Sequence, residues 1–224
     1  MGSDGSPVYF WALIAGVAIG GVYWYFQGKD DARIPMVYLG GLVGAFLGAK
    51  AAFLLAEGWL YDEHPQRWQI LASGKSVVGA LPGGWAGVEI TKRFLGYEAV
   101  TGDRFARLIP LPLILGRLGC LDAGCCQGIH GWPAVPVEIG FQMLAWSGLL
   151  VLKVRRVLPG QHFHLYVIAY GGFRFSHEFL RATPKVVLGL SGYQWIALTT
   201  VVAGWMAFRR RASMNSLRPG DAAT

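Results

Sequence analysis

The feature that most constrains this chain is the recurrence of long apolar runs along almost its whole length. Seven runs occupy about 7–26, 35–56, 69–90, 105–120, 137–153, 162–180 and 187–208. A helix of about 17–25 predominantly apolar residues can cross the roughly 30 Å hydrocarbon layer of a bilayer. Only 15% of the 224 residues are charged, whereas soluble domains have about 25%. The sequence therefore predicts an all-α polytopic membrane protein with about seven transmembrane helices. Six remain an alternative, because the fourth and sixth runs are short or interrupted.

The lysines and arginines between these runs and at their ends indicate the orientation. With the N-terminus outside, the inner segments hold thirteen of them and the outer segments hold only Arg67, Arg181 and Lys185. Cytoplasmic loops carry the excess of positive charge in membrane proteins. The sequence thus predicts an outside N-terminus and a cytoplasmic C-terminus. A single transmembrane domain over 1–211 and a disordered cytoplasmic tail over 212–224 are expected. This topology explains the net charge of +7 without a nucleic-acid partner.

Four basic residues lie within the apolar runs and away from their ends: Lys50, Lys75, Arg117 and Arg174. A cation at membrane depth is costly and normally faces the bundle interior, a counter-charge or a ligand. In the predicted topology all four fall toward the outer face. They predict a cationic pocket for the phosphate of a lipid headgroup, which arginine can bind through two parallel hydrogen bonds. The alternative is snorkelling together with private ion pairs to Glu57, Glu89 or Glu178.

The segment "YGGFRFSHEFLR" concentrates polar residues on one face of a predicted helix. At 100° per residue its polar side chains fall within an arc of about 100°; they are Tyr170, Arg174, His177, Glu178 and Arg181. An i,i+4 pair of Arg174 and Glu178 on a wetted helix would be worth only a few tenths of a kcal/mol. Because this pair lies in an apolar run, we interpret the stripe as functional.

Glycines in "GGLVGAFLGAK" and "GKSVVGALPGGWAG" allow two interpretations. They can let two membrane helices approach closely, or they can expose backbone to a substrate. Pro82, followed by Gly83 and Gly84, predicts a break in the third helix, and irregular backbone at membrane depth is tolerated where it lines a cavity.

All three cysteines lie in "GRLGCLDAGCCQG", at the outer end of the fourth run. A disulfide from Cys120 to Cys125 or Cys126 is feasible in a tight loop. A zinc site formed with His130 is chemically possible but lacks a recognised spacing. Thiol exchange is the third possibility.

The motifs together resemble the prolipoprotein diacylglyceryl transferase family. "GRLGCLDAGCCQG" is similar to the family's glycine-arginine signature loop, and "YGGFRFSHEFLR" to its late Tyr-x-x-x-Arg-x-x-x-Glu helix. "GKSVVGALPGG" resembles its third-helix glycine motif, and "GAKAAFLLAEG" stands where the family has a small-small-Arg stretch. The resemblance runs in order from about residue 38 to 181. It implies seven spans in a bacterial cytoplasmic membrane, with the active site open to the outer leaflet.

The resemblance also implies a reaction. The family moves the diacylglyceryl group of phosphatidylglycerol onto a lipobox cysteine of a preprolipoprotein and releases glycerol phosphate. It implies no cofactor and no metal. It implies catalytic roles for Arg117, Arg174, Tyr170 and Glu178, to which we add His177 as a candidate proton acceptor. Together with the basic residues Lys50 and Lys75 of the apolar runs, the motifs give these expected substrate-binding residues: Ser76, Gly79, Gly116, Gly119, Cys120, Cys125, Gly128 and Arg181.

Departures from the family pattern leave alternatives open. Val78 stands where the best-studied branch has a histidine, and Cys120 and Cys125 replace its asparagine and glutamate. His177 and His130 are the candidate replacements for the proton acceptor. A membrane thiol oxidoreductase using Cys120, Cys125 and Cys126, a relative that transfers a lipid group to another acceptor, and a non-catalytic lipid-binding protein are the alternatives.

Overall fold

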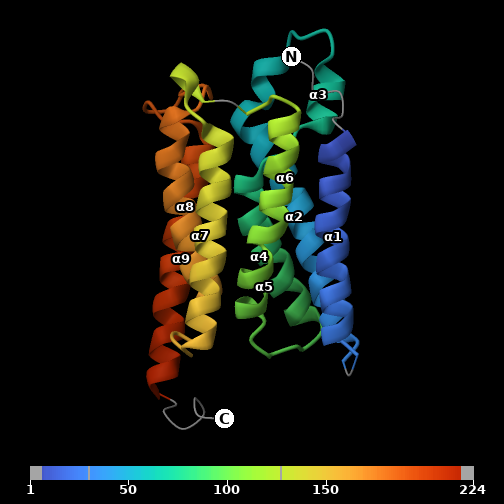
Figure 1. Ribbon diagram of the computed structural model, residues 1–224, viewed down its shortest axis with the longest axis vertical. Coiled ribbons are helices and arrows are strands. Elements are labelled where there is room, and N and C mark those ends of the chain that lie inside the picture. The colour runs from blue at the N-terminus through green and yellow to red at the C-terminus, as the bar shows by residue number, and fades with distance from the viewer. Residues whose placement is uncertain (1–6, 30, 127, 218–224) are drawn as a thin grey trace.

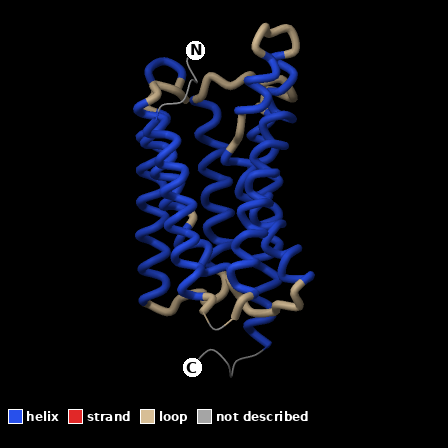
Figure 2. Tube along the Cα trace, turned by 90° about the vertical axis from the view of Figure 1, so that its right-hand side faces the viewer, coloured by secondary structure: helices blue, strands red, loops and turns tan. Residues whose placement is uncertain are grey.

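A computed structural model describes residues 7–29, 31–126 and 128–217. The chain is all-helical over these residues, apart from isolated bridges at Gly128–Arg181 and Val187–Leu190 (Figure 2). The long helices are α1 (Pro7–Gln27), α2 (Arg33–Glu57), α4 (Val77–Phe94), α6 (Pro110–Asp122), α7 (Ala134–Val154), α8 (His162–His177) and α9 (Gly192–Leu217). Short ones are η1 (Gly58–Tyr61), α3 (Arg67–Ser73), α5 (Gly102–Leu108), η2 (Ile129–Gly131) and η3 (Glu178–Leu180).

The long helices run side by side along one axis (Figure 1). The connections α1–α2, α4–α5 and α7–α8 lie at one end of the bundle, together with the C-terminal end of α9. The connections α2–α4, α6–α7 and α8–α9 lie at the other end, where α1 begins. Residues from distant parts of the sequence, in the segments 118–136 and 178–191, therefore meet at that second end.

Three described segments are long and apolar enough to cross a membrane: Phe10–Gln27, Arg33–Tyr61 and Ala134–Val154. Their outer faces carry large exposed apolar side chains, such as Phe46 and Leu55 on α2 and Leu144 on α7. Exposed apolar surface of this extent is unusual for a soluble monomer and suits contact with lipid. The protein is therefore a helical membrane protein.

Two of the predicted helix boundaries are wrong. The run 69–90 is divided between α3 and α4 by an extended break at residues 74–76, and no break occurs at Pro82, which lies inside α4. The run 105–120 is divided into α5 and α6 at Ile109, where Pro110 begins a new helix at a position that proline favours. At the C-terminal end α9 continues to Leu217, past the expected domain boundary at 211; residues 218–224 lie outside the described part.

Two glycine rows bring α2 and α4 into direct backbone contact. Gly40, Gly44 and Gly48 on α2 face Gly79, Gly83 and Gly87 on α4. A Cβ on Gly83 would lie 2.5 Å from the carbonyl oxygen of Gly44, and one on Gly44 would meet the carbonyl oxygen of Gly83. Small residues spaced four apart are the usual means of close helix packing in membranes. The structure thus supports the packing interpretation of these glycines, and α4 continues through Pro82 where it packs against α2.

The buried core lies between α4, α5, α7 and α8. Its members are Leu81, Ala106, Leu149, Phe163, Tyr166, Val167 and Tyr170. The rings of Tyr166 and Tyr170 stack with centroids 5.9 Å apart, and the hydroxyl of Tyr166 donates to Gln142 Oε1 at 2.8 Å. The stacked rings of Tyr166 and Tyr170 thus pack on the same side of α8 as the polar stripe.

Candidate active site

A buried carboxylate, Glu138 on α7, lies at the centre of the polar site. Its Oε2 lies 2.8 Å from Arg117 Nη2 on α6 and 3.1 Å from Arg174 Nη1 on α8. The hydroxyl of Tyr170 donates to its Oε1 at 2.9 Å. Glu138 is 1% exposed and Arg174 is 4% exposed. An unpaired buried charge is very costly. These contacts therefore hold α6, α7 and α8 together at Glu138.

Two further charged residues extend this cluster toward the end of the bundle. Arg174 Nη2 donates to Glu178 Oε2 at 2.9 Å, and Arg181 Nε lies 3.6 Å from the same oxygen. Three arginines and two glutamates leave one net positive charge. Among the described atoms, Arg174 Nε and Arg181 Nη1 are buried without a hydrogen-bond partner. Surplus positive charge and unused N–H donors are what an anion such as a phosphate ester requires.

The predicted stripe on α8 is one buried face. Tyr170, Arg174, His177 and Glu178 are each at most 4% exposed. The predicted i,i+4 ion pair between Arg174 and Glu178 is confirmed. The helix ends at His177 and continues as one 3₁₀ turn, so Arg181 lies just beyond it and pairs with Gly128.

The environment of His177 does not favour a role as proton acceptor. Its Nε2 accepts a hydrogen bond from Trp132 Nε1 at 3.1 Å, and its ring stacks on Phe173 with centroids 4.9 Å apart. A neutral imidazole that accepts at Nε2 carries its proton on Nδ1. The free lone pair that a base needs is therefore occupied by Trp132. The other candidate, His130, is exposed in η2.

Of the four basic residues in the apolar runs, only the two arginines converge. Lys50 Nζ donates to the carbonyl oxygens of Ala72 at 2.9 Å and Gly74 at 3.3 Å. The last carbonyls of a helix are favourable partners for a lysine, and α3 supplies them here. Lys75 is exposed. The expectation of one pocket lined by all four cations is therefore wrong.

Other expected substrate-binding residues have structural contacts. The backbone N–H of Ser76 donates to the carbonyl of Ala49 at 3.0 Å, which ties the start of α4 to α2. Gly79 lies in the α2–α4 contact described above. A Cβ on Gly128 would lie 2.6 Å from the carbonyl oxygen of Trp132, so only glycine fits where the loop meets Arg181. Gly119 is buried within α6.

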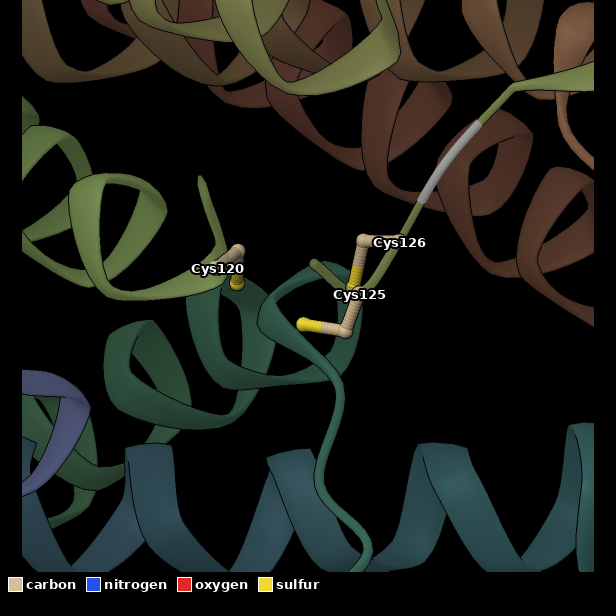
Figure 3. Close-up of side chains that lie close together, drawn as sticks. All are labelled: Cys120, Cys125 and Cys126. Atoms are coloured by element: carbon tan, nitrogen blue, oxygen red, sulfur yellow. The ribbon is translucent and has the colours of Figure 1, made fainter. Parts of the chain in front are cut away.

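The three cysteines gather where α6 ends (Figure 3). Their Sγ atoms lie within 4.8 Å of one another, and none is disulfide-bonded. Arg117 Nη1 donates to Cys120 Sγ at 3.8 Å. Arg117 therefore contacts both the thiols and Glu138, and the two groups form one continuous site.

A largely apolar cavity of about 560 Å³ lies mainly between α1, α2, α4, α5 and α6, and the charged residues Glu89, Lys92, Glu98, Arg210 and Arg211 also line it. The site's arginines do not line it. Gly116, which precedes Arg117, lines the cavity, and Leu81 lines both the cavity and a small separate void against Tyr170 and Arg174. A Cβ on Gly116 would meet nothing within 4 Å. Gly116 thus borders open space within the cavity.

Sequence reasoning missed Glu138, the residue on which the site depends. The counter-charges considered were Glu57, Glu89 and Glu178, of which Glu89 pairs with Lys92 at 3.7 Å. A signal was present: Glu138 is the one acidic residue in the run 137–153, and an acid inside an apolar run is as costly as a base. Gln142 follows one turn later on the same face.

The fold and this site define a helical membrane protein with a buried arginine–carboxylate centre beside an apolar cavity. Comparison with known proteins is consistent with this class. A family model described as prolipoprotein diacylglyceryl transferase matches residues 6–210. The chain therefore belongs to this family and is a transferase.

Similar individual proteins match most of its length. A phosphatidylglycerol–prolipoprotein diacylglyceryl transferase of Clostridium tetani is 28% identical over 204 residues, 81% of this chain and 82% of the relative. Proteins of the same name from Azoarcus sp. and Dehalococcoides mccartyi are 29% and 25% identical, covering 84% and 89% of this chain and 80% and 88% of theirs. The family predicted from the motifs is confirmed.

Proposed function

We propose that this protein transfers the diacylglyceryl group of phosphatidylglycerol to the thiol of a lipobox cysteine in a preprolipoprotein and releases glycerol phosphate. The names of the relatives support the donor and the acceptor class. The observation that carries the proposal is the convergence of Arg117, Arg174 and Arg181 on two buried carboxylates, with one positive charge in excess.

The arginines are suited to the leaving group. A phosphate ester that departs from carbon gains negative charge on its oxygen, and fixed cationic donors stabilise such charge best in a site from which water is excluded. Glu138 and Glu178 hold the guanidinium groups of Arg117 and Arg174 in place before lipid arrives. Arg174 Nε and Arg181 Nη1 have no hydrogen-bond partner among the described atoms and could donate to the phosphate.

The apolar cavity provides room for the acyl chains. Its lining is dominated by small and apolar residues of α1, α2, α4 and α6, and Gly116 brings it next to Arg117. A donor with its chains in the cavity would present its phosphate to the arginines. The carbon between these two parts of the lipid is the one that reacts.

The step is a displacement at carbon. The acceptor sulfur forms a bond to the terminal glyceryl carbon, and the bond from that carbon to the phosphate oxygen breaks. The electron pair leaves with glycerol phosphate, and the thiol proton is lost before or during attack, because the thiolate is the nucleophile.

The membrane arrangement belongs to the same proposal. With α5 and α6 counted together, the long helices of the described residues would make seven passages, and the connections predicted to be cytoplasmic lie at a single end of the bundle (Figure 1). We assign the opposite end, with Arg181 and the cysteines, to the outer face of a bacterial cytoplasmic membrane, in agreement with the distribution of lysines and arginines. Residues 1–211 then form the one transmembrane domain, with the tail in the cytoplasm.

The alternative of a thiol oxidoreductase is not favoured. Its support was the group of three cysteines, whereas the relatives are named as transferases. An exchange of disulfides would also give no role to the buried ion pairs of Arg174.

The proposal is tested by supplying detergent-solubilised protein with labelled phosphatidylglycerol and a lipobox peptide. Mass spectrometry should detect a diacylglyceryl thioether and glycerol phosphate in equal amounts. R174K should lower turnover by about a hundredfold or more, since one ammonium cannot hold both Glu138 and Glu178 and still meet phosphate at two points. R33K, which alters an exposed pair with Asp31, should leave turnover unchanged.

Normal turnover in R174K would show that a single positive charge at this position is enough and that a two-point contact with phosphate is not needed. If product formed only with a nucleophile other than a thiol, the assignment of the donor lipid would stand and the assignment of the acceptor would be wrong. No product with any acceptor, from protein that remains monodisperse, would overturn the proposed function.

A further inference from the structure

The three thiols are brought together by a turn of unusual backbone. Gly124 and Cys126 both have φ of +61°, and the backbone N–H of Cys125 donates to the carbonyl of Cys120 at 3.2 Å. A non-glycine residue in the left-handed region is uncommon and usually needs a reason in the surrounding structure. In Figure 3 the turn directs the sulfur of Cys125 toward Cys120.

The spacing of the sulfurs is close to that of metal ligands. Zn²⁺ binds thiolates at about 2.3 Å, so two sulfurs on a tetrahedral ion lie roughly 3.8 Å apart. The three Sγ atoms already lie within 4.8 Å of one another, and closing the remaining distance requires side-chain rotation rather than rearrangement of helices. The geometry points to a binding site for a thiophilic d¹⁰ cation, Zn²⁺, formed by Cys120, Cys125 and Cys126.

The charges around the thiols suit such a site. Three thiolates and Zn²⁺ carry one net negative charge, and the polar cluster beside them carries one net positive charge. Arg117 Nη1 already donates to Cys120 Sγ. Hydrogen bonds to a ligating atom orient it and are a normal part of a metal site. Arg117 thus links the metal site to Glu138.

The site would keep one position open. Within the described residues no histidine or carboxylate joins the three sulfurs, so His130 is not a fourth ligand. Structural zinc sites have four protein ligands, whereas catalytic ones have three and leave the fourth to water or substrate. Cys125 is exposed and Cys126 partly so. A ligand from outside the chain can therefore reach the metal.

We infer that the fourth ligand is the acceptor thiol. This inference rests on the proposed function, which identifies the acceptor as a thiol. Coordination to Zn²⁺ converts a thiol to a bound thiolate. The thiol proton passes to bulk water, and the bound sulfur then attacks the glyceryl carbon while glycerol phosphate departs toward the arginines. The product thioether is neutral and a weak ligand, so it leaves. Free cysteine is only a few per cent thiolate at pH 7.

Metal binding is tested without any lipid. Reduced protein stripped with a chelator is titrated with Zn²⁺, and separately with Co²⁺, whose spectrum reports its ligands. We expect one bound metal per chain, and for Co²⁺ both the visible bands of a tetrahedral site and a sulfur-to-metal charge-transfer band. C120S/C125S/C126S should lose all of these while remaining monodisperse. Equal metal content in wild type and the triple variant, or cobalt without the charge-transfer band, would overturn the site.

The open position is tested by adding a lipobox peptide to the cobalt-loaded protein. A peptide with cysteine should strengthen the charge-transfer band, and the same peptide with serine should leave it unchanged. Removal of Zn²⁺ by chelation should lower transfer at least ~10-fold, because the fraction of acceptor present as thiolate falls to a few per cent. Return of Zn²⁺ should restore it. An unchanged cobalt spectrum, or transfer unaffected by chelation, would contradict the role in acceptor binding.

Failure of this inference and failure of the proposed function give different results. R174K should bind Zn²⁺ and the peptide as wild type does and yet lose transfer. Wild-type protein that transfers lipid without bound metal would refute the role of the metal in acceptor binding and leave the proposed function standing. Wild-type protein that binds metal and peptide but yields no thioether would refute the function alone. Peptide mapping of membranes prepared without reductant should find three free or metal-protected thiols, and a disulfide from Cys120 would overturn the site.

Discussion

Arg117 Nη2 and Glu138 Oε2 lie 2.8 Å apart and join the C-terminal half of α6 to the first turns of α7. The same carboxylate holds Arg174 on α8, so a single side chain positions two cations from different helices. Both arginines are needed at fixed places before a phosphate arrives, and Glu138 is what fixes them.

The first prediction follows from this shared carboxylate. E138Q should destabilise the protein by about 3–5 kcal/mol, because removing one member of a buried ion-pair group leaves the others uncompensated. The loss should appear as a lower unfolding midpoint, followed by tryptophan fluorescence in detergent, together with loss of lipid transfer.

A surface ion pair supplies the control for E138Q. Asp62 lies 3.1 Å from Arg67, and both side chains are at least 40% exposed. D62N should change stability by less than about 1 kcal/mol. If E138Q unfolded no more readily than D62N, the buried cluster would not be needed for the fold.

The second prediction concerns the glycine contact of α2 with α4. G44A should destabilise the bundle by roughly 1–3 kcal/mol. The added methyl would meet backbone atoms of Gly83 and Gly87, so the two helices would have to move apart. Thermal unfolding in one detergent measures the difference. G148A is the matched control, since its methyl would meet nothing within 4 Å. Equal midpoints for the two variants would show that the helices separate freely.

The third prediction concerns orientation. A variant that keeps only Cys125, which is exposed, should react with a membrane-impermeant maleimide added to intact cells after chelation. The positive-inside distribution requires this side to be outer. In a cysteine-free background, R156C at the α7–α8 connection should react only after the membrane is opened. The reverse pattern would invert the topology.

The fold was predictable from the sequence wherever one apolar run corresponds to one helix. The runs 35–56 and 137–153 lie within the long helices α2 and α7. Hydropathy could not detect the break at residues 74–76, because the apolar residues of α3 precede it directly and hide it. Pro82 misled for a different reason. A proline removes one helical hydrogen bond, but helices in a membrane tolerate this where neighbouring helices pack closely, and α2 packs closely on α4 at this level.

The site was partly predictable for a similar physical reason. The stripe of Tyr170, Arg174 and Glu178 lies on one helix, so periodicity alone brought it together. Glu138 comes from another helix, and its meeting with Arg117 depends on how α6, α7 and α8 pack. Lys50 shows where the sequence argument predicts too much. A basic residue in an apolar run can donate to backbone carbonyls, and no sequence pattern reveals such a contact.

The last prediction tests the apolar cavity as the place of the acyl chains. Gly116 borders that cavity and has free space where a side chain would project. G116F should therefore fold normally, yet fill the part of the cavity nearest Arg117 and shift the donor lipid. A displacement of about 1 Å from the reactive geometry can cost roughly a hundredfold in rate, so we expect kcat/KM for phosphatidylglycerol to fall at least ~10-fold. Phosphatidylglycerol with short acyl chains should be affected less, because it needs less of the cavity. G148F places the same ring in open space on α7, away from the cavity residues, and should transfer both lipids as wild type does. If G116F lost activity equally for long and short chains, the added ring would be disturbing Arg117 rather than excluding lipid, and the acyl chains would have to lie elsewhere.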